Sequence, residues 1–141
     1  MNKTGLIVAL ILAFTLVGNA SMTTQAEEKV EPEDRDWPSY VYDGDTTVEM
    51  HMRCREAYDI LEKRMQTVFD QLLAEIDDEA DALAKQNQQD WQQYALSKRS
   101  FDADIYRGGS LAGPTAGVSY ISELCRRIKE LQHAIEDRRP N

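Results

Sequence analysis

The residues best suited to binding a metal are two histidines and two cysteines. His51 and Cys54 have an H-x-x-C spacing, and Cys125 with His133 could complete a set of four zinc ligands. Zinc needs both cysteines as thiolates, whereas two thiols in an oxidising compartment pair with each other. Because the N-terminus described below indicates export, we predict that the chain binds no metal and no other cofactor.

Two acidic arrangements also lack the features of a reactive site. The sequence DGD at 43–45 begins like a calcium loop, but the positions that should hold Gly and Glu are Val48 and Cys54. Asp102 and Asp104 could act as acid and base only with opposed pKa values in a shaped cleft, and a small helical body offers little cleft. No serine has a nucleophile-elbow context. We predict that the chain is not an enzyme.

The stretch YRGGSLAGPT, residues 106–115, holds three of the seven glycines and one of the four prolines. Its glycines adopt positive φ at low cost and can end a helix, and Pro114 suits the first turn of another. Small residues also let a backbone approach a partner closely, although the same residues could serve only as a turn. The predicted partner-binding residues are Tyr106, Gly108, Gly109 and Ser110.

The N-terminus has the layout of a secretory signal peptide. Lys3 precedes an apolar run at 5–18, which is shorter than the roughly 20 residues of a membrane span. Cleavage after Ala20 or Ala26 fits the small-residue pattern, and an uncleaved anchor is the alternative. We predict a signal peptide at 1–26 and a periplasmic or secreted protein, with no membrane association beyond export.

The chain is strongly acidic, with 25 Asp and Glu against 16 Lys and Arg and a formal charge of -9. Cleavage of residues 1–26 removes one lysine and no acid, which brings the charge to about -10. This charge disfavours nucleic acid, because its phosphates are also negative. It favours a basic protein as the partner.

Three amphipathic stretches must position these residues. Apolar side chains at steps of three and four predict helices over 48–76, over 79–105, and from 114 or 115 to 137. An unbroken helix over 48–105 would be about 85 Å long, so we expect a turn at 77–79, with a kinked continuous helix as the alternative. The predicted core residues are Leu61, Met65, Phe69, Trp91, Tyr94, Phe101, Ile121 and Ile128.

Short connections between these helices predict an all-α, up-down-up three-helix bundle over residues 47–141. The first and third helices then run parallel, and Cys54 and Cys125 differ in height by about 6 Å. Both cysteines lie on apolar stripes, so we predict a disulfide between them.

Residues 27–46, which precede the helices, are acidic, contain two prolines and show no periodicity. They predict an extended linker. Its three aromatic residues either dock on the helical body or form a recognition segment, and both alternatives stay open. They are Trp37, Tyr40 and Tyr42.

Several motifs in order resemble the LprI-like lysozyme-inhibitor family. They are LEKRMQTVFDQLL (61–73), LAKQNQQDWQQY (83–94) and YRGGS (106–110), followed by a cysteine-bearing last helix. Gln88, Trp91 and Tyr94 match the Q-x-x-W-x-x-Y pattern of that family, and Cys54 and Cys125 match its opening and late cysteines. The cysteine that many members carry shortly after the tyrosine is missing here.

The resemblance spans about residues 47–135 and implies a small exported bacterial helical domain with a lysozyme-type peptidoglycan hydrolase as its partner. The alternative is a non-enzymatic envelope or stress-related interaction module with an unknown partner. In that case the aromatic linker and the polar face of the second helix would carry binding. That face comprises Asn87, Gln88, Gln89, Gln92 and Gln93. The sequence leaves the oligomeric state open.

Overall fold

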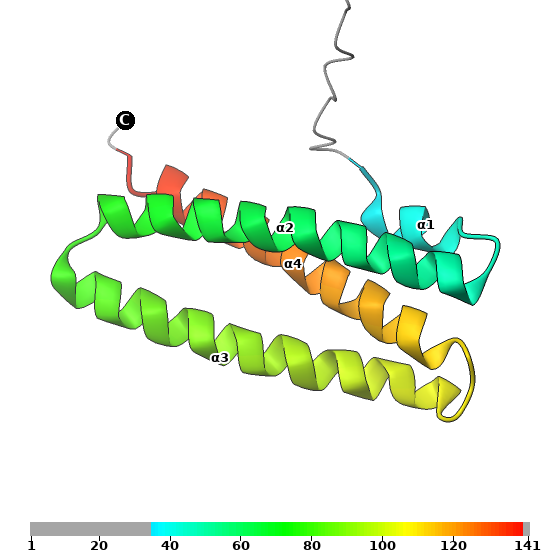
Figure 1. The fold of residues 1–141 in the computed structure, drawn as a ribbon. Coiled ribbons are helices and arrows are strands. Elements are labelled where there is room, and N and C mark those ends of the chain that lie inside the picture. The colour runs from blue at the N-terminus through cyan, green and yellow to red at the C-terminus, as the bar shows by residue number, and fades with distance from the viewer. Residues whose placement is uncertain (1–34, 140–141) are drawn as a thin grey trace, which may run out of the picture. The chain divides into compact units, whose positions relative to one another are not determined.

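The computed structural model describes residues 35–139, and every regular element in that range is helical. Figure 1 shows three long helices, each reversing the direction of the one before it. The predicted all-α class is confirmed, with a fourth, short helix that the prediction lacked. The elements are α1 (Trp37–Tyr42), α2 (Thr47–Glu75), α3 (Asp78–Ala103), the 3-10 turn η1 (Asp104–Tyr106) and α4 (Ala112–Glu136).

Side-chain caps determine where α2 and α3 begin. The Thr46 hydroxyl accepts a hydrogen bond from the amide of Glu49 at 3.1 Å, and the Asp77 carboxylate accepts one from the amide of Ala80 at 2.9 Å. Each cap satisfies a backbone N–H that has no partner within its helix. Because Ile76 and Asp77 have extended backbones, the chain turns between α2 and α3. The predicted turn is confirmed, and the kinked continuous helix is wrong.

Helix α4 is the centre of the fold, and α1, α2 and α3 all pack against it. Most of the core lies between α2 and α4, whereas α3 buries only Ala95. Four of the predicted core residues lie in this core, and Met65 and Trp91 are partly buried against it. The four are Leu61, Phe69, Ile121 and Ile128.

The other two predicted core residues, Tyr94 and Phe101, are exposed by 50% and 79%, so their assignment to the core is wrong. The reason is a rotation of α3 by about one residue. The face of α3 that meets α4 is a stripe of mostly polar residues spaced three and four apart. Tyr94 and Phe101 each lie one residue before a member of this stripe, Ala95 and Asp102, so their rings lie outside it. The stripe consists of Gln88, Trp91, Ala95, Lys98 and Asp102.

The segment at 37–42 is a helix docked on the domain and not part of an extended linker, so that prediction is wrong there. Asp36 caps the helix through the amide of Ser39, and the Trp37 side chain is buried. The Tyr40 hydroxyl donates a hydrogen bond to the Glu56 carboxylate at 2.5 Å. Docking therefore holds for Trp37 and Tyr40, whereas Tyr42 is exposed.

Cys54 and Cys125 are free thiols, so the predicted disulfide is wrong. The contacts between the parallel helices α2 and α4 give the reason. Cys54 lies level with Gly117, whereas Cys125 shares a cavity wall with Leu61. Gly117 and Cys125 are eight residues apart, or about 12 Å along the helix. A disulfide needs Cα atoms within about 7 Å of each other.

The predicted signal peptide lies outside the described residues. Within residues 35–139, no helix has the length and apolar character that a membrane span requires.

Candidate functional site

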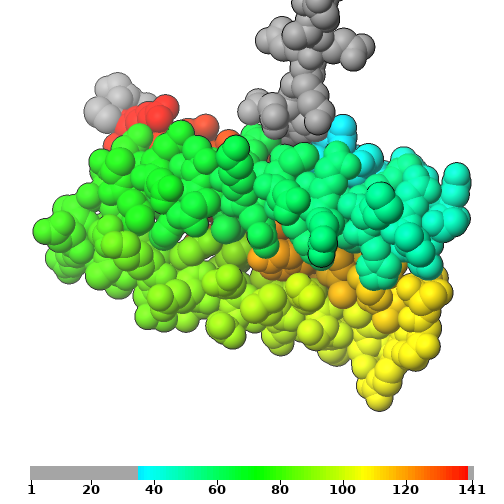
Figure 2. Space-filling view, in the orientation of Figure 1, coloured from blue at the N-terminus to red at the C-terminus, as the bar shows by residue number. Residues whose placement is uncertain are grey.

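The predicted partner-binding loop is a tight turn between η1 and α4. Gly108 has φ of +77°, a conformation that residues with a Cβ adopt only at a cost. The Gly109 amide donates to the Tyr106 carbonyl at 2.8 Å, and Arg107 pairs with Asp104 in the turn before it. All four predicted residues are exposed, including Ser110. The loop is therefore held by local hydrogen bonds and faces solvent, and in Figure 2 this segment, in yellow, projects from the domain.

Large apolar side chains are exposed around this turn. Of the ten such side chains in the described residues, seven lie at the end of the bundle where α2 begins and α3 ends: Tyr42 at the end of α1, and six on α2, α3, η1 and the turn. Phe101 and Ile105 are the most exposed, at 79% and 76%. Gathered apolar exposure of this kind marks an interaction surface. We call this region the loop end; it comprises Val48, Met52, Phe101, Ile105, Tyr106 and Leu111 together with Gly108, Gly109 and Ser110.

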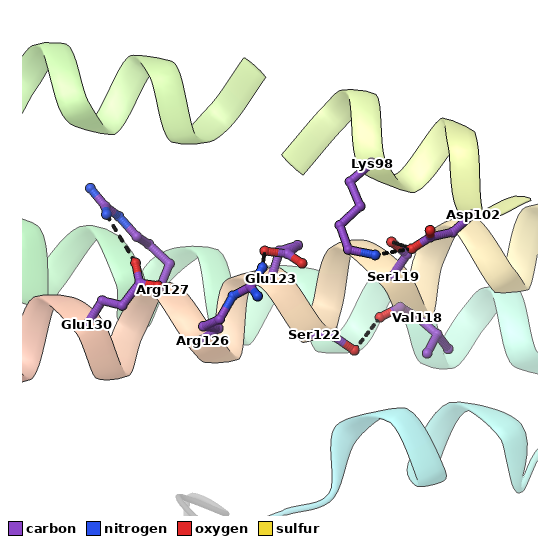
Figure 3. A network of polar contacts seen from close by, with 9 residues as sticks. All are labelled: Lys98, Asp102, Val118, Ser119, Ser122, Glu123, Arg126, Arg127 and Glu130. Carbon is purple, nitrogen blue, oxygen red and sulfur yellow. Dashed lines mark hydrogen bonds and ion pairs between the residues drawn. The ribbon is translucent and has the colours of Figure 1, made fainter. Parts of the chain in front are cut away.

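Polar contacts hold α3 onto α4 next to the loop end. Asp102 accepts hydrogen bonds from the Lys98 ammonium at 2.5 Å and from the Ser119 hydroxyl at 2.6 Å, as Figure 3 shows. The Lys98 bond first, and the Ser119 bond second, lower the pKa of the Asp102 carboxyl. Asp104 is paired with Arg107. These two carboxylates are thus bound to separate cations and do not form an acid–base pair.

A second polar cluster binds the middle of α3. The buried guanidinium of Arg127 donates to the side-chain oxygens of Asn87 at 2.7 Å and Gln88 at 2.9 Å, and it lies 5.7 Å from the centre of the Trp91 ring. In the sequence, Arg127 looks like a solvent-facing charge in the basic second half of α4. Only its contact with α3 explains its burial.

Two glycines of α4 let α2 approach closely. A Cβ on Gly113 would lie 2.2 Å from the His51 ring, and one on Gly117 would lie 2.3 Å from the Cys54 sulfur. Sequence reasoning missed this contact, although the four-residue spacing of small residues on one helix face is a signal for close helix packing.

The candidate zinc ligands are not brought together. Among residues 35–139, no group of three or more His, Cys, Asp or Glu side chains could hold a metal ion. Burial raises the pKa of both the Cys54 and the Cys125 thiol. Because the thiolate is the reactive form, both thiols are poor nucleophiles and poor metal ligands at neutral pH.

Comparison with known proteins agrees with the resemblance. The sequence model of the family described as "Lysozyme inhibitor LprI" matches residues 42–131, more than half of the chain. The match runs from the last residue of α1 through most of α4 and includes the loop end. No curated protein and no solved structure gives a significant match.

Proposed function

The chain belongs to the LprI family of lysozyme inhibitors, and from this membership we propose that it is an exported, non-enzymatic inhibitor of lysozyme-type peptidoglycan hydrolases. The family match supports the partner class, and the N-terminal sequence supports export. Cys54 is buried and Cys125 is partly buried, and burial raises the pKa of both thiols, so both react slowly with disulfides and can remain free in an oxidising compartment.

The charge of the chain supports this partner. Lysozymes are usually basic, and the chain carries a formal charge of -9. Opposite net charges steer two proteins together and raise the association rate more than the final affinity. Inhibition should therefore weaken as salt increases, since the Debye length falls from about 10 Å at 0.1 M to about 3 Å at 1 M.

We assign binding to the loop end, and the exposure of Phe101 and Ile105 beside the glycine turn is the observation that carries the assignment. Aromatic and large apolar side chains dominate the energy of protein interfaces once they are desolvated. The turn between them presents backbone with little side-chain bulk, which suits entry into an enzyme cleft.

Lysis of purified peptidoglycan by lysozyme tests the proposal. The chain without residues 1–26 should slow lysis in a dose-dependent way. Phe101→Ala with Ile105→Ala should weaken inhibition by about 30-fold if the pair contributes about 2 kcal/mol. Leu83→Ala is the matched control, because Leu83 is 68% exposed near the opposite end of α3. Full lysis at a large excess of the folded protein would rule out inhibition. If Leu83→Ala weakened inhibition as much as the Phe101→Ala and Ile105→Ala pair, the assignment of binding to the loop end would be wrong.

Four of the eight residues required by the alternative interaction module make contacts within the domain, whereas Tyr42, Gln89, Gln92 and Gln93 are exposed. Trp37 is buried and Tyr40 binds Glu56, while Asn87 and Gln88 bind Arg127. If lysozyme is not inhibited, the loop end remains the surface to use in a search for another envelope partner, with the Phe101→Ala and Ile105→Ala pair as the negative control.

A further inference from the structure

A cavity of about 630 Å³ lies beside the loop end, where the first turns of α2 and α4 meet the C-terminal half of α3. Small-molecule sites in proteins have volumes of about 300–1,000 Å³. Each helix contributes a wall: α2 provides Met52 and Arg55, α3 provides Arg99, and α4 provides Ala116 and Gly117. The size and the mixture of apolar and polar walls suit a small organic ligand.

The charged groups of this cavity are all cationic. Arg55 and Arg99 line it, and no aspartate or glutamate does, although acids outnumber Lys and Arg by 25 to 16 in the chain. Within the described residues, neither arginine has a carboxylate at ion-pair distance; Arg99 instead lies 5.8 Å from the centre of the Tyr120 ring. Two guanidiniums without a carboxylate partner, on two walls of one cavity in an acidic protein, favour a negatively charged ligand.

Two further polar features of the cavity also favour a negatively charged ligand. Burial, as the main cause, raises the pKa of Tyr58 to about 12, so its hydroxyl keeps its proton and can donate a hydrogen bond. The first turn of α4 has no side-chain cap, and a helix N-terminus carries partial positive charge. Gly113, in that turn, and Gly117, one turn later, also line the cavity.

We propose that this cavity binds a small organic anion, with its carboxylate or phosphate group between Arg55 and Arg99 and its apolar body against Val48 and Met52. Guanidinium groups bind both carboxylate and phosphate in a bidentate way, so the two ligand classes share this chemistry. The ligand would share Val48 and Met52 with the loop end, but its charged group would lie between two arginines that are not part of the loop end, so anion binding can be tested separately from lysozyme inhibition.

Calorimetric titration of the chain without residues 1–26 tests this site with three probes of similar shape: benzoate, phenyl phosphate and benzamide. At least one anion should bind with saturation, and benzamide, which lacks the charge, should bind at least tenfold more weakly. The tighter of the two anions identifies the ligand class. No saturable binding of either anion up to 20 mM, or equal binding of benzamide, would overturn the proposal.

Substitutions locate the binding. Arg55→Gln and Arg99→Gln should each weaken binding of the better anion about tenfold. Arg139→Gln is the matched control, because this exposed arginine pairs with Glu75 at the other end of the bundle and should leave binding unchanged. Arg99→Lys keeps the charge and should retain part of the affinity, which separates a lost contact from a folding defect. Binding that survives both glutamine substitutions would overturn the assignment.

Discussion

Substitution of Gly117 by alanine tests the closest contact between α2 and α4. A Cβ at this position would lie 2.3 Å from the Cys54 Sγ atom and 3.2 Å from both the Cys54 Cβ atom and the Tyr58 hydroxyl oxygen. Cys54 is buried, and rotation of its sulfur would leave the close contacts with the Cys54 Cβ atom and the Tyr58 hydroxyl oxygen in place. The two helices would therefore have to move apart.

The expected loss follows from two opposing effects. Alanine in place of glycine inside a helix stabilises by about 0.5–1 kcal/mol when there is space. Overpacking of a core costs about 1–3 kcal/mol. The net effect of Gly117→Ala is a loss of about 1–2 kcal/mol, or about 5–10 °C in Tm for a domain of this size. If Cys54 is first replaced by alanine, the sulfur is gone and Gly117→Ala should cost little or nothing.

Urea unfolding followed by circular dichroism at 222 nm measures this cycle of four proteins. The coupling between the two substitutions should be about 1–2 kcal/mol. Gly113→Ala is the control, because its Cβ would meet only the tip of the exposed His51 ring, which can rotate away. The register of α2 on α4 would be refuted if Gly117→Ala left stability unchanged, or if it cost the same in the Cys54→Ala background.

Four further measurements follow from the same contacts. Trp37→Ala should cost about 3–5 kcal/mol in urea unfolding, because the ring is buried under α1; a loss below 1 kcal/mol would mean that α1 is not docked. Arg127→Gln should speed amide hydrogen exchange in α3 more than in α2, because hydrogen bonds to charged groups contribute about 1.5–3 kcal/mol each and these bind α3; uniform acceleration would contradict this role. Mild oxidation followed by peptide mapping should find no link between Cys54 and Cys125, and a high yield of that link would contradict the register. The pKa of Asp102 lies below its ordinary value of 3.8, so its contribution to stability is present above that pH and is lost as pH falls through the folded pKa. The Tm of Asp102→Asn should therefore fall less steeply than that of the wild type below pH 4, and parallel curves would count against the Lys98–Asp102 contact.

The ends of the long helices could be predicted because the signals for them are local. Thr46 and Asp77 cap α2 and α3 through residues three positions later in the chain, and Gly108 takes the positive φ that its lack of a Cβ allows. The aliphatic stripes of α2 and α4 identify their buried faces in the same way. For these features, the residues that determine the structure lie within one helical turn of it.

The disulfide prediction failed because the relative height of two helices is not a local property. Counting residues from the helix starts gave a difference in height of about 6 Å between Cys54 and Cys125. Because Cys54 packs against Gly117, the difference is about 12 Å. One small residue lets the two helices meet at that level and so determines their register. The error over Tyr94 and Phe101 has a related origin, since aromatic residues were assigned to the core by type while α4 presents Ser119, Glu123 and Arg127 to α3.

The packing of α3 explains why the loop end exposes apolar side chains. Because α3 meets α4 through Ala95 and a row of polar contacts, its large apolar residues near the C-terminus, Phe101 and then Ile105 in η1, face solvent. Stability alone would favour the opposite arrangement, since burial of one such side chain contributes about 1.5–3 kcal/mol. A partner that covers Phe101 and Ile105 would recover this energy and hold α3 in place as well. Binding at the loop end and docking of α3 on α4 should therefore be coupled, so that a variant with weakened α3 contacts, such as Arg127→Gln, also binds the partner more weakly.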